Sequence, residues 1–440
     1  MISDKRDGGP AYLHRESKRE LADRNKPKSK EAEMKCKCKM AVAFLLVLVM
    51  LVPLSLSCGG EKEGVTIRIG EHTDLTGPGS PAVVGLHYVL QDLVRYYNEE
   101  GLIPGVKLAV DSWDGKYDPS RDISGYDWLR GRGAKLIVSV IPHTGVDLKP
   151  FADREKFPIC NLSTMKAMLE PPGWVFCFSN PSYWQMKTLL KWISENHWDY
   201  ARGIPKVGFI GWSEPNGIDV EKGMDEYCQA HPDKFEWVGG SLPPMGVMAF
   251  SGDVNKLKGC DYLCAYGFPT GTIIGKYLDQ GYRATFIDVG TATNYRGFLV
   301  DQLGYERLDG MLVGNVSLGW NDQTPIVNLA KQLLNRYRSG QAERIMYEGF
   351  VYAGGLQNLI SVFQILQQAI EKVGAQNFDS QDFYDAAIHY ETGGSLFEGY
   401  PQWSFSEAKR YLVDHVAISE FSAEAGNFVW NGAWVPLLLE

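Results

Sequence analysis

The chain has 440 residues, of which 45% are hydrophobic and 22% are charged, with 47 Gly and 22 Pro. This composition is that of an ordinary globular protein and excludes disordered, collagen-like and coiled-coil chains, while the length favours two domains over one. Residues 58–440 carry 32 basic and 46 acidic side chains, a net charge of −14, so nucleic acid is a poor partner for this part of the chain.

The N-terminal residues have the pattern of an export signal. Residues 1–33 are polar and without apolar periodicity, and we expect either a disordered arm or sequence upstream of a true start at Met34. Residues 40–56 form an apolar run of 17, preceded by three Lys, which is shorter than the roughly 20 residues of a spanning helix. A basic region followed by an apolar region is typical of a secretory signal, which we place at residues 34–57.

Cys58 follows this signal in the sequence Leu54-Ser-Leu-Ser-Cys-Gly-Gly. The segment resembles a bacterial lipobox, in which the cysteine is lipidated and becomes the mature N-terminus. It departs from the usual form at Ser55, where an aliphatic residue is expected. The resemblance implies an exported protein that is lipid-anchored on the outer face of the cytoplasmic membrane, with a tether at residues 58–64. An uncleaved anchor is the alternative.

From residue 65 the chain alternates strand and helix patterns. Residues 65–70 alternate apolar and polar side chains, as a strand does. A helix is expected to begin at Ser80, a good N-cap, with Pro81 at its first position and Gly101 at its end. Further strands are expected at residues 106–110, 136–140 and 157–160.

The same rhythm then restarts. Helices are expected at residues 184–197, 219–230 and 270–279, and strands at 206–210, 235–238, 261–265 and 284–287. A third run begins with a strand at 311–313 and ends in a long helix at 352–373. Repeated strand–helix alternation predicts an α/β protein of two doubly wound, Rossmann-like lobes. We expect lobe 1 to comprise residues 65–183 plus 311–398, and lobe 2 residues 184–310 plus 399–440.

Five cysteines lie in this body, so at least one of them stays unpaired. Cys260 and Cys264 share a predicted strand about 13 Å apart, which is too far for a disulfide. Buried small hydrophobic side chains are the better interpretation for most of the five: Cys160, Cys177, Cys228, Cys260 and Cys264.

The loops that follow the strands are the candidate ligand site, because open α/β sheets bind ligands outside the carboxyl ends of their strands. These loops hold hydroxyls, amides, glycines and aromatic rings, with few candidate general acids or bases. Such a set suits binding rather than catalysis. The candidates are Ser80, His143, Thr144, Ser163, Thr164, Trp212, Asn216, Phe268 and Asp288.

Enzyme signatures fail on inspection. Residues 271–277 resemble a P-loop but are one residue short and lack the final Ser or Thr. Residues 77–81 are not a nucleophile elbow, because Pro81 directly follows Ser80. The histidines show no metal-binding spacing. We therefore expect no catalytic residue, no metal and no cofactor.

Five segments follow one another in an order typical of a known family. This order resembles the leucine/isoleucine/valine-binding protein family, the type I periplasmic solute-binding proteins of ABC importers. The resemblance implies two α/β lobes that are joined by crossing hinge strands and close on a ligand. The segments are IRIG to LTGPGS at 67–80, IPHTG at 141–145, FPICNLST at 157–164, VFCFSNPSYWQ at 175–185 and KVGFIGWSEPNG at 206–217.

The same resemblance implies roles for single residues. Thr144 falls on the hydroxyl that binds the ligand carboxylate, and Ser163 and Thr164 fall near an Ala/Thr pair, although Met165 is an alternative for the Thr. Asn216 stands where the family often has Tyr, and Phe268 stands near a second aromatic residue.

The sequence differs from the amino-acid binders of this family in one loop. Gly290 occupies the position where they often place an acid for the ligand ammonium, and Asp288 is the candidate substitute. The implied function is a solute-binding protein that delivers a small amino acid, carboxylate or amide to ABC permease subunits. A ligand-sensing periplasmic receptor of the same fold is the alternative.

Overall fold

The structure is a computed structural model that describes residues 64–439. The chain divides into two units, Met1–Lys62 and Glu63–Glu440, and all described elements lie in the second. The predictions for Cys58, for the signal peptide at 34–57 and for the arm at 1–33 lie outside the described residues.

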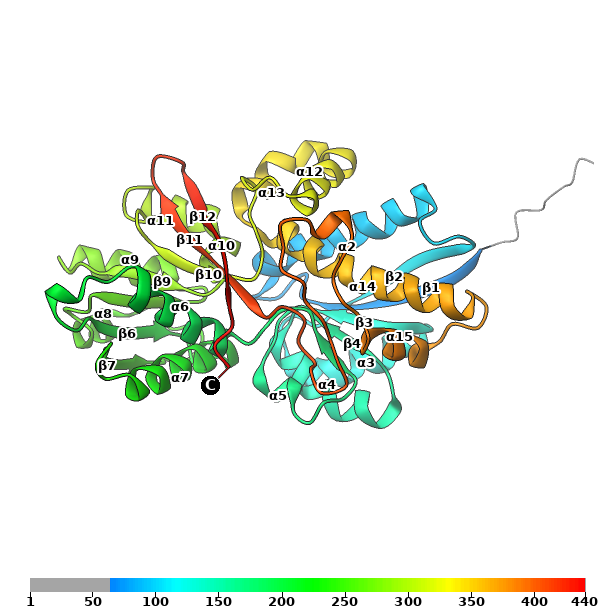
Figure 1. Cartoon of the computed structure of the whole chain (residues 1–440), viewed down its shortest axis with the longest axis horizontal. Helices are drawn as coiled ribbons and strands as arrows, with labels where there is room; N and C mark the ends of the chain where they lie inside the picture. The colour runs from blue at the N-terminus through cyan, green and yellow to red at the C-terminus, as the bar shows by residue number, and fades with distance from the viewer. Residues whose placement is uncertain (1–63, 440) are drawn as a thin grey trace, which may run out of the picture. The chain divides into compact units, whose positions relative to one another are not determined.

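The first lobe is built on a parallel sheet of five strands in the order β2-β1-β3-β4-β5 (Figure 1). Its middle strands are apolar on both faces, as expected for a parallel sheet covered by helices. The strands are β1 (Val65–Thr73), β2 (Val106–Asp114), β3 (Ala134–Ser139), β4 (Ile159–Asn161) and β5 (Val175–Cys177), and the helices between them are α2 (Ser80–Glu100), α3 (Asp122–Gly131), α4 (Pro142–Glu155) and α5 (Lys166–Leu169).

The second lobe has a sheet of seven strands in the order β12-β11-β10-β9-β8-β6-β7. Its first five strands in chain order are parallel, and β11 joins β10 in antiparallel fashion. The elements are α6 (Ser182–Asn196), β6 (Lys206–Gly211), α7 (Pro215–Ala230), β7 (Glu236–Ser241), α8 (Ser251–Lys256), β8 (Tyr262–Tyr266), α9 (Thr270–Asp279), β9 (Thr285–Asp288), α10 (Thr291–Asn294), α11 (Arg296–Leu303), β10 (Leu312–Asn315), β11 (His415–Ser422) and β12 (Asn427–Pro436).

Four more helices return the chain to the first lobe, where α12 and α14 contact α2. The Ser380 hydroxyl at the start of α15 donates to the Lys135 carbonyl of β3. Among the described residues no single helix meets the length and hydropathy of a membrane span, and one pair, α12–α13 with α14, meets them jointly across a 103° bend. The helices are α12 (Pro325–Arg338), α13 (Ala342–Glu348), α14 (Val351–Val373) and α15 (Ser380–Ala387).

The chain therefore crosses between the lobes three times, at residues 178–181, 316–324 and 413–414. The expected two-lobed fold is confirmed, but two of the expected lobe boundaries differ from the structure. The strand expected to open the returning part of lobe 1 is β10, which pairs with β9 in the second sheet. Residues 399–412 still belong to the first lobe, because Phe405 packs 5.4 Å from Phe176 and Tyr411 bridges to Cys177.

The first long helix, α2, has the extent that its sequence predicts at the C-terminal end but not the predicted N-cap. Apolar side chains spaced three or four residues apart in α2 are buried, and the expected end at Gly101 is confirmed, in the left-handed region at φ 60°. Ser80, expected as the N-cap, is instead the first helical residue, and Gly79 is the cap. The Ser80 hydroxyl donates to the Leu75 carbonyl, so it stabilises the preceding loop rather than the first turn.

All five cysteines of the described chain are free and buried. Burial raises the pKa of the Cys177, Cys228 and Cys260 thiols to about 12. Cys260 precedes β8 rather than sharing that strand with Cys264. The interpretation of these side chains as small hydrophobic residues is confirmed by their burial.

Candidate functional site

A cavity of about 660 Å³ lies where the carboxyl ends of the strands of both sheets meet. Loops that follow β1 to β10 all contribute to its wall, so both lobes share the site. The lining residues are Pro78, Gly79, Val83, Tyr117, Val140, Pro142, Leu162, Ser163, Thr164, Ser179, Asn180, Ser182, Gln185, Trp212, Glu214, Asn216, Met245, Gly246, Tyr266, Gly267, Phe268, Val289, Gly290, Thr291, Asn294, Tyr295 and Val316.

Aromatic rings form much of the wall on the side of the second lobe. The rings of Trp212 and Phe268 stack at 20° with centroids 6.4 Å apart, and the Tyr295 ring lies 5.0 Å from Phe268. The Trp212 indole N–H donates to the Val247 carbonyl at 2.7 Å, which fixes the plane of that ring. A flat or branched apolar group is the ligand part that such a wall accommodates.

The charge of the lining is unusual. Among the described residues that line the cavity there is one carboxyl group, that of Glu214, and no Lys, Arg or His. Burial raises the pKa of Glu214 to about 7. Burial also raises the pKa of the Tyr117 and Tyr295 phenols, which therefore stay neutral at ordinary pH.

Backbone N–H groups supply positive potential that no lining side chain provides. Five helices of ten or more residues begin at the wall: α2 after Gly79, α4 at Pro142, α6 at Ser182, α7 next to Asn216, and α9 just after Phe268. The first N–H groups of a helix have no partner within it and favour negative charge. A ligand carboxylate or carbonyl oxygen can therefore be held here without a cationic side chain.

Five of the candidates from the sequence come together on the wall. Ser163 and Thr164 follow β4, Trp212 and Asn216 follow β6, and Phe268 follows β8. The side-chain oxygen of Asn216 has no hydrogen-bond partner within the described chain.

The other four candidates lie behind the wall. Thr144 is buried and its hydroxyl donates to Asp122 at 3.0 Å, while His143 Nδ1 lies 2.8 Å from the same carboxylate. Asp288 is buried and accepts from the backbone of Ala292 at the start of α10, and Ser80 bonds within its own loop. Their neighbours Gly79, Pro142 and Gly290 line the cavity instead.

Among the lining residues that were absent from the sequence candidates, three carry an ionisable side chain outside a strand. Tyr117 follows β2 and sits in the left-handed region at φ 54°, Glu214 is the N-cap of α7, and Tyr295 follows α10. Glu214 lies in the family-like segment at residues 206–217, and a charged side chain in a loop after a strand was the sequence feature that could have identified it. Nothing in the local pattern distinguishes Tyr117 or Tyr295 from other surface tyrosines.

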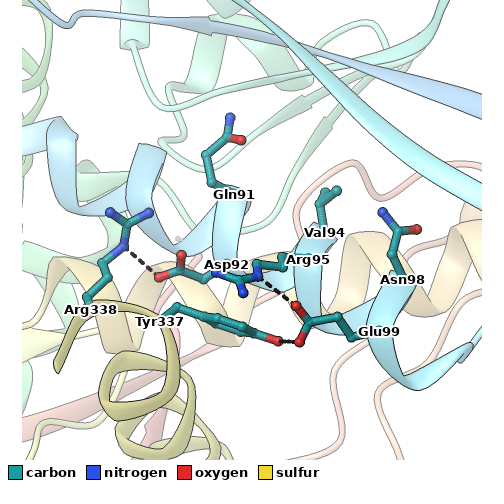
Figure 2. A pocket seen from close by; sticks show the side chains of 8 residues that line it. All are labelled: Gln91, Asp92, Val94, Arg95, Asn98, Glu99, Tyr337 and Arg338. Carbon is teal, nitrogen blue, oxygen red and sulfur yellow. Dashed lines mark hydrogen bonds and ion pairs between the residues drawn. The ribbon is translucent and has the colours of Figure 1, made fainter.

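A second hollow of about 460 Å³ lies between α2 and α12 (Figure 2). Its charged groups already pair with one another. Arg338 donates to Asp92 at 2.6 Å, and both Arg95 and Tyr337 donate to Glu99, at 2.6 and 2.7 Å. These groups join the two helices, so the cavity between the lobes is the better ligand site.

The family of periplasmic binding proteins has a model that matches residues 66–392 of the chain. The search of curated proteins found no match.

Solved structures of similar fold cover about 85% of the chain. A branched-chain amino acid ABC transporter protein from Thermus thermophilus with bound valine has 16% identity and a TM-score of 0.72, over 85% of this chain and 97% of its own. A fatty acid ABC transporter substrate-binding protein from Thermomonospora curvata has 15% identity and a TM-score of 0.68, over 85% and 92%. A solute-binding protein from Rhodopseudomonas palustris BisB5 in complex with 3,4-dihydroxybenzoic acid has 14% identity and a TM-score of 0.67, over 85% and 97%. At these identities the likeness establishes the fold.

Proposed function

Because the chain belongs to the periplasmic binding protein family, we propose that it is the extracytoplasmic solute-binding protein of an ABC importer. It takes a small amino acid, carboxylate or amide into the cavity between its lobes and presents the closed form to the permease. The observation that carries this proposal is the 660 Å³ cavity, whose wall is divided between both lobes. A ligand that touches both lobes favours the closed state by its extra contacts.

The lining supports a ligand with an apolar or aromatic body and one polar end. The body lies against Trp212 and Phe268, and the carboxylate or amide oxygen accepts from backbone N–H groups at helix starts and from Ser163. An ammonium or amide nitrogen donates to Glu214, which takes the place that the sequence suggested for Asp288. The described residues of the wall include one carboxyl group and no basic side chain. Of amino acids, carboxylates and amides, a carboxylate without a nitrogen donor is therefore the least favoured solute.

In this proposal the chain binds its solute without converting it, on the outer side of the cytoplasmic membrane. Lipid attachment at Cys58 holds it near the permease, and the resemblance of residues 54–58 to a lipobox supports this anchor. The alternating crossings of the chain between the lobes allow a hinge motion between them.

A thermal-shift screen of residues 59–440 tests the proposal. The panel holds L-valine, L-phenylalanine, benzoate, 3,4-dihydroxybenzoate, benzamide, a short fatty acid and urea. A ligand that binds only the folded state stabilises it by about 2.7 kcal/mol at a hundredfold excess over Kd, and this raises the unfolding midpoint. We expect a dose-dependent rise with one class and recovery of the solute unchanged. Conversion of the solute to a product would overturn the proposal.

A further inference from the structure

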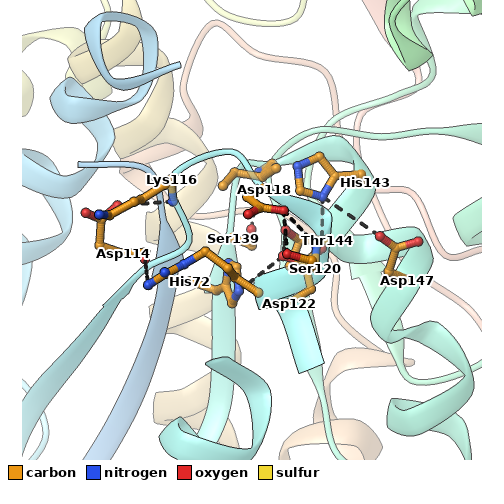
Figure 3. Close-up of polar contacts among 12 residues, drawn as sticks. His72, Asp114, Lys116, Asp118, Ser120, Asp122, Ser139, His143, Thr144 and Asp147 are labelled. Carbon is orange, nitrogen blue, oxygen red and sulfur yellow. Dashed lines mark hydrogen bonds and ion pairs between the residues drawn. The ribbon is translucent and has the colours of Figure 1, made fainter. Parts of the chain in front are cut away.

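Three metal-ligating side chains meet where α3 and α4 begin (Figure 3). Asp122 is the first residue of α3, and His143 and Asp147 lie one turn apart on α4. One ligand atom from each lies within 4.8 Å of the other two. We propose that Asp122, His143 and Asp147 bind one divalent transition-metal cation of the Zn²⁺ type, behind the wall of the cavity.

The charges at this place favour a cation. The Asp122 carboxylate is fully buried, and the Asp147 side chain is 43% exposed, on the side open to solvent. Neither carboxylate forms an ion pair with a Lys or Arg of the described chain. Two carboxylates that share one imidazole, without a basic side chain, leave negative charge that a divalent cation would neutralise.

The distances suit a zinc ion with an open position. His143 Nδ1 lies 2.8 Å from Asp122 Oδ2 and 3.9 Å from Asp147 Oδ2. Tetrahedral Zn²⁺ holds His nitrogen and carboxylate oxygen at about 2.0–2.1 Å, which places its ligand atoms about 3.3 Å apart. The two observed distances lie on either side of that value. Three protein ligands leave the fourth position for water, which enters past the exposed Asp147.

A second histidine points at the same carboxylate. His72 is the penultimate residue of β1 and is fully buried. Its Nε2 lies 3.3 Å from Asp122 Oδ1, whereas His143 lies beside the other oxygen of that carboxylate. Neither ring nitrogen of His72 has a hydrogen bond that meets ordinary geometry within the described chain. A side chain at Gly115 or Gly125 would come within 2.7 Å of the ring, so these two glycines are what allow it to sit there. His72 is thus an outer partner that orients Asp122 for a metal.

The cation site touches the cavity wall without being part of it. The Tyr117 ring, which lines the cavity, packs edge-on against the His143 ring at 5.1 Å and 88°. Pro142, directly before His143, also lines the cavity. A bound cation therefore fixes the His143 ring, against which the Tyr117 ring of the cavity wall packs.

Zinc titration of residues 59–440 tests the proposal, because every described element lies in the unit Glu63–Glu440. The protein is first stripped with EDTA, and Zn²⁺ binding is followed by calorimetry and by the unfolding midpoint. We expect one ion per chain, a rise in the midpoint and its reversal by EDTA. Absence of any response in the unmodified chain would overturn the proposal.

Two exposed aspartates provide the matched pair of variants. Asp147→Asn removes a ligand, whereas Asp127→Asn removes the same charge from the exposed face of α3. We expect Zn²⁺ affinity to fall at least tenfold in Asp147→Asn and to remain unchanged in Asp127→Asn, with both variants folded in EDTA. Equal affinities in the two variants would overturn the proposal, since zinc would then bind elsewhere.

Discussion

The indole ring of Trp212 and the phenyl ring of Phe268 stack at 20°, 6.4 Å apart, although 56 positions separate them in the chain. Each ring follows a different strand, β6 or β8, and these strands are neighbours in the second sheet. The pair is therefore a product of the sheet order, and it forms one face of the proposed solute site.

Replacement of Phe268 by Ala is expected to weaken binding of the solute identified in the screen by at least tenfold. The variant loses apolar contact area and the face against which an aromatic or branched group packs. Calorimetric titration measures the change. Phe298→Ala, at a phenylalanine of α11 that is 45% exposed, is the matched control and should bind as the unmodified chain does. Equal losses in both variants would count against the location of the site.

Two variants that each remove a hydroxyl group distinguish a residue on the cavity wall from one buried behind it. Ser163→Ala should weaken solute binding, because Ser163 lines the cavity. Thr144→Val should leave affinity unchanged but lower the free energy of unfolding by about 1–3 kcal/mol, since it removes a buried hydrogen bond to the Asp122 carboxylate. Calorimetry and urea unfolding measure the two effects. A large loss of affinity in Thr144→Val would restore the carboxylate role that the resemblance implied.

Glu214 should make stability depend on pH. Its pKa is raised by burial from 4.5 to about 7, so the folded state favours the protonated form. Below the unfolded value both states are protonated and the shift has no effect, whereas above about pH 7 the folded chain must bury the charge. Stability attributable to this group therefore falls as pH rises from about 4.5 to 7.

The variant Glu214→Gln measures that contribution. Its unfolding midpoint should match the unmodified chain near about pH 4 and exceed it near about pH 8. Glu306→Gln, at an exposed glutamate, should match at both pH values. A midpoint of Glu214→Gln that tracks the unmodified chain at high pH would show that Glu214 is ionised at no cost.

The five thiols should resist modification in the folded protein. All are buried, and burial holds the pKa of each thiol above its ordinary value. Mass spectrometry after iodoacetamide treatment of residues 59–440 should find no label in buffer and five labels in denaturant. A single site labelled equally fast in both conditions would contradict the burial of that side chain.

Lipid attachment is expected to depend on Cys58 alone among the cysteines of the leader. Full-length Cys58→Ala, expressed in a bacterial host, should lose the acyl mass and leave the detergent phase on partitioning. Cys38→Ala is the control and should keep both. Retention of Cys58→Ala in the detergent phase without a lipid mass would favour the uncleaved anchor. A lipid mass that persists in Cys58→Ala would contradict attachment at Cys58.

Much of the fold was predictable because its elements follow local rules. The helix expected at 270–279 is α9 (Thr270–Asp279), and every strand expected between 65 and 313 has a counterpart. The hairpin of β11 and β12 was missed, because its Trp and turn residues obscured the alternation of apolar positions. The place of β10 beside β9 depends on pairing between distant segments, which no local pattern encodes.

The site was predictable at the level of loops but not of side chains. The loops after the strands do line the cavity, as the rule for open α/β sheets predicts. Whether a given residue faces the cavity depends on the first turn of the next helix: Pro142 lines it, whereas Thr144 turns inward to Asp122. The meeting of Asp122 with His143 and Asp147 likewise depends on two helices that follow β2 and β3, the strands on either side of β1.

Small-angle X-ray scattering of residues 59–440, with and without the solute from the screen, tests most directly whether the lobes close on a ligand. We predict that saturating solute lowers the radius of gyration of the unmodified chain. The same concentration should have little effect on Phe268→Ala. Superimposable curves for the unmodified chain, at a concentration that raises its unfolding midpoint, would contradict closure of the lobes around the cavity.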